Sequence, residues 1–328
     1  MFKVEFGGVL IESFFNELTK ERIDYIVLRN HEGLPQINSS KDVDILIDKK
    51  NLFITNKILI KLYQELEYNF IWENKLDYLT GYAFIKKIDN IIYSVKIDIF
   101  HGLKWRGLNY LDNNIIFNKK NEYHSLFIPN KSHESFIMII YYILYAKSIK
   151  EKYFNNIYTY KNDIENFIRI SSLALDNALS EKIVKVLENK NIPKLLSYRK
   201  EIIKNIFIKN LKYFPLLIKN VTNHLYCEVF KRNSFGTIVL FDKNCNEKDF
   251  ITDIFIDLGI GYKVESQTKF TTFELLKILR KNPLIVLDKK DLSKFQKKIF
   301  SNRILNVKNS SLDTIFSNIQ KSLKKDKI

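Results

Sequence analysis

The segment Asp42-Val-Asp44-Ile-Leu-Ile47, preceded by Tyr25-Ile-Val-Leu-Arg29-Asn30, decides how this chain is interpreted. Both segments are short and apolar, which is typical of buried strands, and a polar loop separates them. Side chains alternate between the two faces of a strand, so Asp42 and Asp44 share one face, and Val43 and Ile45 point to the other. Two carboxylates this close repel each other unless a positive charge lies between them. A divalent cation with oxygen ligands is the usual remedy, and it suits phosphate chemistry.

The composition is that of an ordered globular protein with room for more than one domain. Of 328 residues, 46% are hydrophobic, and only 5 are Pro and 9 are Gly. Apolar runs stay shorter than the roughly 20 residues that a membrane span requires. The sequence shows no signal-peptide layout, and Cys227 and Cys245 are too few for a disulfide framework or a cysteine-based metal cluster. We therefore expect a cytoplasmic protein without a transmembrane segment.

The formal net charge of +16 raises the question of nucleic-acid binding. Basic residues are spread along the chain among acidic ones, and basic runs such as Lys289-Lys290 are short. Net charge by itself supports only non-specific attraction. Nucleic acid is therefore not the expected partner. Anionic lipid headgroups in peripheral contact with a membrane, or a phosphorylated substrate, fit the charge at least as well.

The apolar pattern divides the chain into an α+β domain at residues 1–130, a helical domain at residues 131–232 and a small α/β domain at residues 233–328, so the expected fold class is α/β. In the first region we expect helices at 9–18 and 52–66, and strands at 25–28, 42–47, 82–88 and 91–100, the last two joined by a turn at Asp89-Asn90. In the second region we expect helices at 136–146, 162–172, 180–188 and 193–208.

The third region contains four β-α repeats, which predict a small parallel sheet covered on both faces. Its strands are expected at 237–241, 262–265, 283–287 and 303–307, and its helices at 248–258, 272–280, 292–300 and 311–323.

The first region resembles the polymerase-β-type nucleotidyltransferase superfamily. In that superfamily a small-residue motif precedes a D-x-[DE] pair in a strand, and a third carboxylate lies on a later strand. Leu28-Arg29-Asn30 stands in the place of the first motif, Asp42 and Asp44 match the pair, and Asp98 in Val95-Lys-Ile-Asp98-Ile-Phe is the third carboxylate. Alternation supports Asp98, because it projects from the strand face opposite to its apolar neighbours.

More narrowly, the segments around Leu34-Pro35 and Trp105-Arg106-Gly107 look like nucleotidyltransferase-like proteins of bacterial surface-polysaccharide and peptide-modification gene clusters. Some of these carry a thymidylate-kinase-like P-loop domain after a helical segment. The resemblance covers the first 130 residues well and the arrangement of the rest loosely. In this chain Lys248 stands near the position of the P-loop lysine, but the glycines of the motif are missing and Asp249 replaces its hydroxyl residue. We expect a degenerate kinase-like domain that serves packing, dimerisation or partner binding.

The resemblance implies an in-line, two-metal displacement on a nucleoside triphosphate. Asp42 and Asp44 would ligate Mg²⁺ or Mn²⁺, and Asp98 would help hold the second metal and orient or deprotonate an acceptor hydroxyl. The residues expected to contact the triphosphate are Arg29, Asn30, Ser39, Ser40 and Arg106. Arg29-Asn30 replaces the usual Gly-Ser or Gly-Gly, which alters the standard backbone approach to phosphate. His101 would assist proton transfer or fill a structural role.

The expected function is therefore a nucleotidyl transfer from a nucleoside triphosphate to a small or carbohydrate-linked acceptor, as in surface-polysaccharide biosynthesis. Two alternatives stay open. The first is a non-catalytic partner or scaffold protein on the same fold, and the second is a metal-dependent phosphoryl or glycosyl transferase. The sequence leaves the nucleotide, the acceptor and the oligomeric state undetermined.

Overall fold

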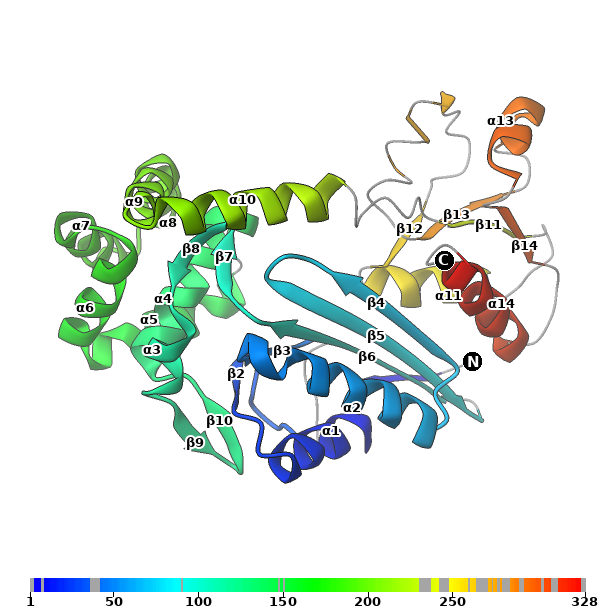
Figure 1. The fold of residues 1–328 in the computed structure, drawn as a ribbon, viewed down its shortest axis with the longest axis horizontal. Helices are drawn as coiled ribbons and strands as arrows, with labels where there is room; N and C mark the ends of the chain where they lie inside the picture. Colours follow the sequence, from blue (N-terminus) through cyan, green and yellow to red (C-terminus); the bar gives the residue numbers. More distant parts are fainter. Residues whose placement is uncertain are drawn as a thin grey trace.

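The computed structural model describes residues 3–6, 9–35, 42–89, 91–146, 148–149, 151–229, 237–241, 248–258, 260–263, 271–272, 274–275, 278, 284–288, 292–301, 304–307 and 312–325. It is a mixed α/β structure in which a mixed sheet and a small parallel sheet lie on either side of a helical segment in the sequence (Figure 1).

The mixed sheet has the strand order β2-β3-β6-β5-β4, and β1 runs parallel to the first half of β6. Strands β3 and β6 are parallel, whereas the pairs β2–β3, β5–β6 and β4–β5 are antiparallel. The elements are β1 Lys3–Phe6, α1 Val9–Lys20, β2 Tyr25–Arg29, β3 Asp42–Ile47, α2 Leu52–Glu65, β4 Phe70–Lys75, β5 Leu79–Ile88 and β6 Ile91–Phe100. The predicted helices and strands of this region are confirmed, and β5 begins three residues earlier than expected.

One face of this sheet is largely apolar and is covered by α1 and α2 (Figure 1). Alternate residues of β2 and β3, such as Val27, Val43 and Ile45, join Phe14 of α1 and Leu59 of α2 in one core. These residues are at most 1% exposed. Since successive side chains of a strand alternate, the carboxylates of β3 and β6 point to the other face of the sheet.

The second face carries two apolar patches with polar residues between them. Near the end of β3, Leu46 packs with the helical segment, together with Ile26 and Leu28 of β2. Further along β5 and β6, Ala83, Ile85 and Ile92 pack with the C-terminal sheet domain. Between the two patches the strands present Asp42, Asp44, Lys96 and Asp98. Packing from both sides therefore leaves a polar strip in the middle of this face.

The middle region contains two small hairpins and a set of helices. Its elements are β7 Leu103–Trp105, β8 Leu108–Leu111, α3 Asn113–Phe117, β9 Asn121–Tyr123, β10 Leu126–Ile128, α4 Lys131–Tyr141 continued by a π-helical turn Tyr142–Ala146, α5 Phe154–Tyr158, α6 Ile164–Ala174, α7 Asn177–Glu188, α8 Ile192–Ser197, α9 Arg199–Leu211 and α10 Phe214–Val229. The single helix predicted at 193–208 is wrong, because the chain forms α8 and α9, which meet at Tyr198. Neither α10 nor the hairpins β7–β8 and β9–β10 were expected.

The C-terminal region is a parallel sheet with the order β12-β13-β11-β14, as the β-α repeats predict. Its elements are β11 Thr237–Phe241, α11 Lys248–Asp257, β12 Gly261–Lys263, β13 Leu284–Asp288, α13 Lys294–Ile299, β14 Ile304–Val307 and α14 Leu312–Lys325. The predicted helix at 272–280 is only partly described, and the loop that would hold a P-loop, 242–247, falls outside the described residues.

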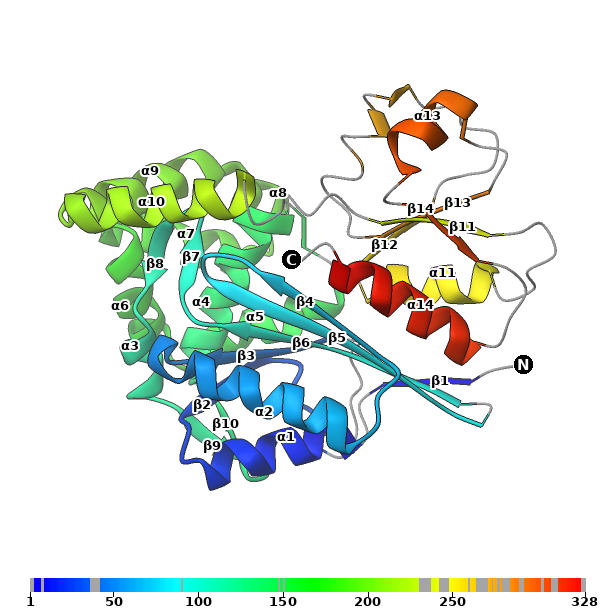
Figure 2. The ribbon, with the colours of Figure 1, turned by 45° about the vertical axis from the view of Figure 1, so that its right-hand side comes forward.

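Helices α11 and α14 lie between the two sheets (Figure 2). The ring of Phe70 on β4 contacts Phe255 of α11 edge-on at 5.3 Å between centroids, and Phe255 contacts Phe316 of α14 at 6.0 Å. A hydrogen bond from the Ile71 amide to Gln320 Oε1, 2.9 Å long, fixes α14 against β4. Among the described residues, no helix has both the length and the apolar content needed to cross a bilayer.

These contacts predict that Phe70 stabilises the junction between the mixed sheet and the C-terminal domain. Phe70 is fully buried, so Phe70→Ala should lower the free energy of unfolding by about 3–5 kcal/mol, the usual cost of removing a buried ring. Urea denaturation measures the change. The control is Leu173→Ala on α6, where the side chain is 48% exposed and little change is expected. Equal stability of the two variants would contradict the described packing.

Candidate metal centre

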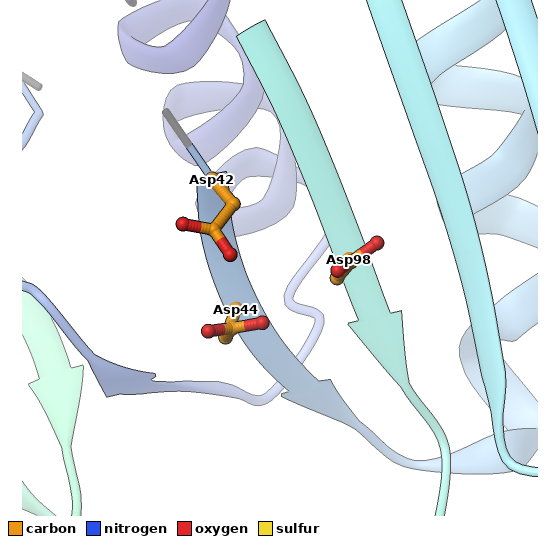
Figure 3. A group of neighbouring side chains, drawn as sticks. All are labelled: Asp42, Asp44 and Asp98. Carbon is orange, nitrogen blue, oxygen red and sulfur yellow. The ribbon is translucent and has the colours of Figure 1, made fainter. Parts of the chain in front are cut away.

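Three carboxylates meet on the polar strip of the mixed sheet. The parallel register of β3 and β6 places Asp44 directly beside Asp98, and Asp42 lies two residues before Asp44 on the same face. Figure 3 shows Asp42 and Asp44 on one strand and Asp98 on its neighbour. One oxygen from each carboxylate lies within 4.8 Å of the oxygens of the other two. The sequence prediction that these three residues converge is therefore confirmed.

This spacing suits a divalent cation. Oxygens on opposite sides of Mg²⁺ are about 4.2 Å apart, because each lies about 2.1 Å from the ion. Asp44 and Asp98 are 1% and 6% exposed, and among the described residues neither Asp44 Oδ1 nor Asp98 Oδ1 has a hydrogen-bond partner. Buried carboxylate oxygens without a partner are costly, and a cation is the ligand that would satisfy them. The donor set fits Mg²⁺ or Mn²⁺.

Two basic side chains contact the same carboxylates. Arg29, at the end of β2, donates from Nε to Asp44 Oδ2, and its Nη2 lies 3.8 Å from Asp42 Oδ2. Burial lowers the pKa of Arg29, but the charge of Asp44 and its hydrogen bond, with smaller contributions from Tyr141 and Asp42, together raise the pKa above its usual value. The guanidinium is therefore a fixed positive charge beside the pair. It compensates part of the repulsion between the carboxylates that the sequence implies.

Lys96 supplies a positive charge beside Asp98. Its Nζ lies 2.5 Å from Asp98 Oδ2, and the two residues share one face of β6. Burial opposes the charge of Lys96, yet the negative charge of Asp98 raises its pKa. The chain thus supplies one cation to each buried carboxylate and leaves the second oxygen of each without a hydrogen-bond partner among the described residues.

Burial raises the pKa of Asp98 to about 6. Lys96 opposes this shift, whereas the charge of Asp44 adds to it. Asp98 is therefore mostly ionised at neutral pH but sits close to its titration point. A carboxylate of this kind can exchange a proton near pH 6 and can gain a full charge when a cation binds beside it.

The helical segment holds Arg29 in place. The guanidinium carbon lies 4.5 Å from the ring centroid of Tyr141 at the end of α4, in a cation–π arrangement. Tyr141 stacks on Tyr145 with centroids 5.6 Å apart, and Tyr145 in turn contacts Tyr78 at the tip of the β4–β5 hairpin. The side of the site next to Arg29 is thus built from the middle region.

Gly81 on β5 makes room for Asp98. The two residues are directly opposite in the antiparallel pairing of β5 and β6. A Cβ atom added to Gly81 would lie 2.7 Å from Asp98 Oδ1, closer than real Cβ contacts allow. A glycine inside a strand is typical of such a close approach.

The structure says less about the other residues that the sequence predicts to contact the triphosphate. Asn30 follows β2 with a φ of 55°, a left-handed backbone conformation that Asn tolerates. It therefore adopts a conformation that is also open to the glycine of the expected motif. Ser39 and Ser40 fall within residues 36–41, outside the described residues. Arg106 lies exposed in the β7–β8 turn with its guanidinium 5.1 Å from the Trp105 ring, and its role as a phosphate clamp stays a prediction. His101 follows β6, and its amide donates to the Tyr78 carbonyl.

Sequence reasoning missed Lys96, Gly81 and Tyr141. Lys96 was within reach, because the alternation that places Asp98 on the polar face places Lys96 there too. The glycine in an otherwise apolar strand was a second readable signal. No sequence signal pointed to Tyr141, because its contact with Arg29 depends on how α4 packs against the sheet.

Comparison of the chain with protein-family models, with curated proteins and with solved structures gave no match.

The position of Gly81 yields a prediction about the geometry of the site. In Gly81→Ala the new methyl group would clash with Asp98 Oδ1 from the β5 side and displace the Asp98 carboxylate from its present position, so Mn²⁺ affinity should fall roughly 10- to 100-fold, as for other residues that position a ligand. Electron paramagnetic resonance of free Mn²⁺ measures binding. The matched control is Gly102→Ala, where the atoms nearest to the added Cβ belong to the flexible Lys104 side chain, the closest at 3.0 Å. Equal affinity in both variants would contradict this role of Gly81.

The raised pKa of Asp98 predicts a pH dependence of metal binding. A bound cation requires the ionised carboxylate, so affinity should be constant above about pH 7 and fall about tenfold per pH unit below 6. Mn²⁺ titrations from pH 5 to 8, a range that brackets this pKa, would measure how the affinity changes with pH. In Asp98→Asn the remaining affinity should lose this step near pH 6, and a step that persists would assign it to another group.

Proposed function

We propose that this chain is a metal-dependent nucleotidyltransferase that moves a nucleotidyl group from a nucleoside triphosphate to the hydroxyl of a small or carbohydrate-linked acceptor. The observation that carries the proposal is the convergence of Asp42, Asp44 and Asp98 on two parallel neighbouring strands. Oxygen ligands of this kind select hard divalent cations, which in enzymes commonly accompany phosphates. The resemblance of the first 130 residues to polymerase-β-type nucleotidyltransferases points to the same chemistry.

The metal would be held by Asp42, Asp44 and Asp98, and when bound it would neutralise charge on the triphosphate and on the attacking and leaving oxygens. In the transfer, the acceptor oxygen forms a bond to the α-phosphorus, and the bond to pyrophosphate breaks. Asp98 can orient the acceptor hydroxyl or accept its proton, the role that the resemblance implies for this carboxylate.

Arg29 is the residue best placed to bind phosphate. Its planar guanidinium can donate two parallel hydrogen bonds to phosphate oxygens. It now engages Asp44 and lies near Asp42, so a metal ion bound to these carboxylates would compete with it for their oxygens. We propose that Arg29 turns from Asp44 to the triphosphate when metal and nucleotide bind together. The stacked Tyr141 ring would keep the guanidinium close by.

A second candidate is a non-catalytic scaffold with the same fold. Its support is that Arg29 and Lys96 already supply a positive charge to each buried carboxylate. A site that had lost its metal would need such substitutes, because unpaired buried charges are strongly destabilising. In this case the protein would bind a partner enzyme or a glycan intermediate and would not respond to nucleotides.

The test is release of pyrophosphate from each nucleoside triphosphate with Mg²⁺, together with mass analysis of the products. Asp44→Asn should reduce the rate roughly 100- to 1,000-fold, since it removes charge stabilisation at the reacting phosphate. Asp24→Asn is the control, because this exposed residue pairs with Lys120 away from the site. Release of inorganic phosphate or of a sugar product would assign phosphoryl or glycosyl transfer instead.

Two results would contradict the proposal. Equal pyrophosphate release from the wild type and the Asp42→Ala/Asp44→Ala double variant would show that the carboxylates are not involved. The absence of any rise in melting temperature with Mg²⁺ and each nucleotide would favour the scaffold, because a ligand that binds only the folded protein must stabilise it.

A further inference from the structure

The tip where α9 meets α10 presents large apolar side chains to solvent. Tyr213 and Phe214 are 68% and 57% exposed, and Ile218 on the next turn of α10 is 50% exposed. We call this surface the apolar tip, formed by Ile208, Leu211, Tyr213, Phe214, Leu216 and Ile218, all more than 40% exposed. Single exposed apolar residues are ordinary, but a contiguous group usually marks an interaction surface.

The tip is held rigidly by contacts on its inner side. Asn210 of α9 donates from Nδ2 to the Asn109 carbonyl and accepts from the Asn109 amide, at 2.8 and 3.1 Å. The β7–β8 turn approaches α10 so closely that a Cβ on Gly107 would lie 2.8 Å from the Val221 Cα. Leu217 is 6% exposed on the inner face of α10. The apolar residues of the tip therefore point outward because the opposite face is already used.

Basic residues surround the tip. Lys204, Lys212 and Lys219 are all exposed on α9, on α10 or between them. Glu201 of α9 is paired with Lys182 of α7 at 3.4 Å. In the part of the chain that the structure describes, these three lysines form no ion pair. The surface thus combines apolar side chains with positive charge, which is the composition of segments that lie in the interface of an anionic membrane.

We infer that the apolar tip and its lysines dock this protein on an anionic phospholipid bilayer, with the tip side chains among the headgroups and the lysines against lipid phosphates. Aromatic residues such as Tyr213 and Phe214 favour this depth of the membrane, and long lysine side chains can reach the headgroups from beside them. The inference goes beyond the proposed function and does not depend on it.

The charge favours a membrane over a second copy of the chain. A symmetric dimer through this surface would bring the lysine-rich surfaces of two copies together. That repulsion would oppose association, whereas phosphate groups of a bilayer would attract the same residues. The net charge of +16 acts in the same direction at longer range.

The experiment is sedimentation of the full chain with vesicles of phosphatidylcholine alone or mixed with phosphatidylglycerol. The wild type should bind the mixed vesicles, with affinity that falls as salt rises, and should bind neutral vesicles weakly. Tyr213→Ser/Phe214→Ser should abolish most binding, and Lys204→Gln/Lys212→Gln/Lys219→Gln should weaken it by roughly fivefold per lysine, about a hundredfold in all.

Matched controls test whether binding depends on where the aromatic and basic residues lie, or only on how many the protein has. Phe53→Ser removes a 67% exposed ring from α2, and Lys20→Gln/Lys50→Gln/Lys119→Gln removes the same charge from exposed positions outside α9 and α10. Both controls should bind like the wild type, and melting temperatures should confirm that every variant is folded. Serine is a good residue at the start of a helix, so the tip variant should fold.

Three results would overturn the inference. They are no binding of the wild type to mixed vesicles, equal binding by tip variants and controls, and a wild-type dimer that the tip variant converts to a monomer without any vesicle binding. The last result would assign the surface to a second copy of the chain.

Discussion

The pairing of β3 with β6 is the constraint on which the candidate site depends. In this parallel register Asp44 stands beside Asp98, and both are buried. Two buried carboxylates side by side are unfavourable unless cations compensate them. Arg29 from β2 and Lys96 from β6 provide this compensation in part, and the oxygens that these two residues leave unbonded, Asp44 Oδ1 and Asp98 Oδ1, are where a metal ion would add most.

The polar strip exists because both ends of the same sheet face are covered by other parts of the chain. The helical segment packs around Leu46, and the C-terminal domain packs around Ala83 and Ile92. Such packing lowers the effective dielectric near the carboxylates and strengthens every charge interaction there. The raised pKa of Asp98 is one consequence. The C-terminal parallel-sheet domain therefore contributes to the site through burial.

Much of the fold follows from local patterns. The strands of the mixed sheet that carry the carboxylates are strongly apolar on one face, and the C-terminal β-α repeats have regular spacing, so both were predictable. The elements that were missed have weak patterns. Strand β4 reads Phe-Ile-Trp-Glu-Asn-Lys, which is largely polar toward its end, and α10 has apolar residues on nearly all sides. The wide apolar surface of α10 hid its helical periodicity, and it also forms part of the exposed tip.

The sequence by itself determined which side chains share a strand face, because the alternation of a β-strand is a property of the backbone. That rule placed Asp42 with Asp44 and separated Asp98 from its apolar neighbours. Only the tertiary structure decided which strands are neighbours, that Arg29 and Lys96 pair with Asp44 and Asp98, and that Gly81 leaves space for Asp98. These contacts join residues far apart in the chain or depend on side-chain rotamers. Packing of the whole domain sets both the pairing of distant residues and the rotamers.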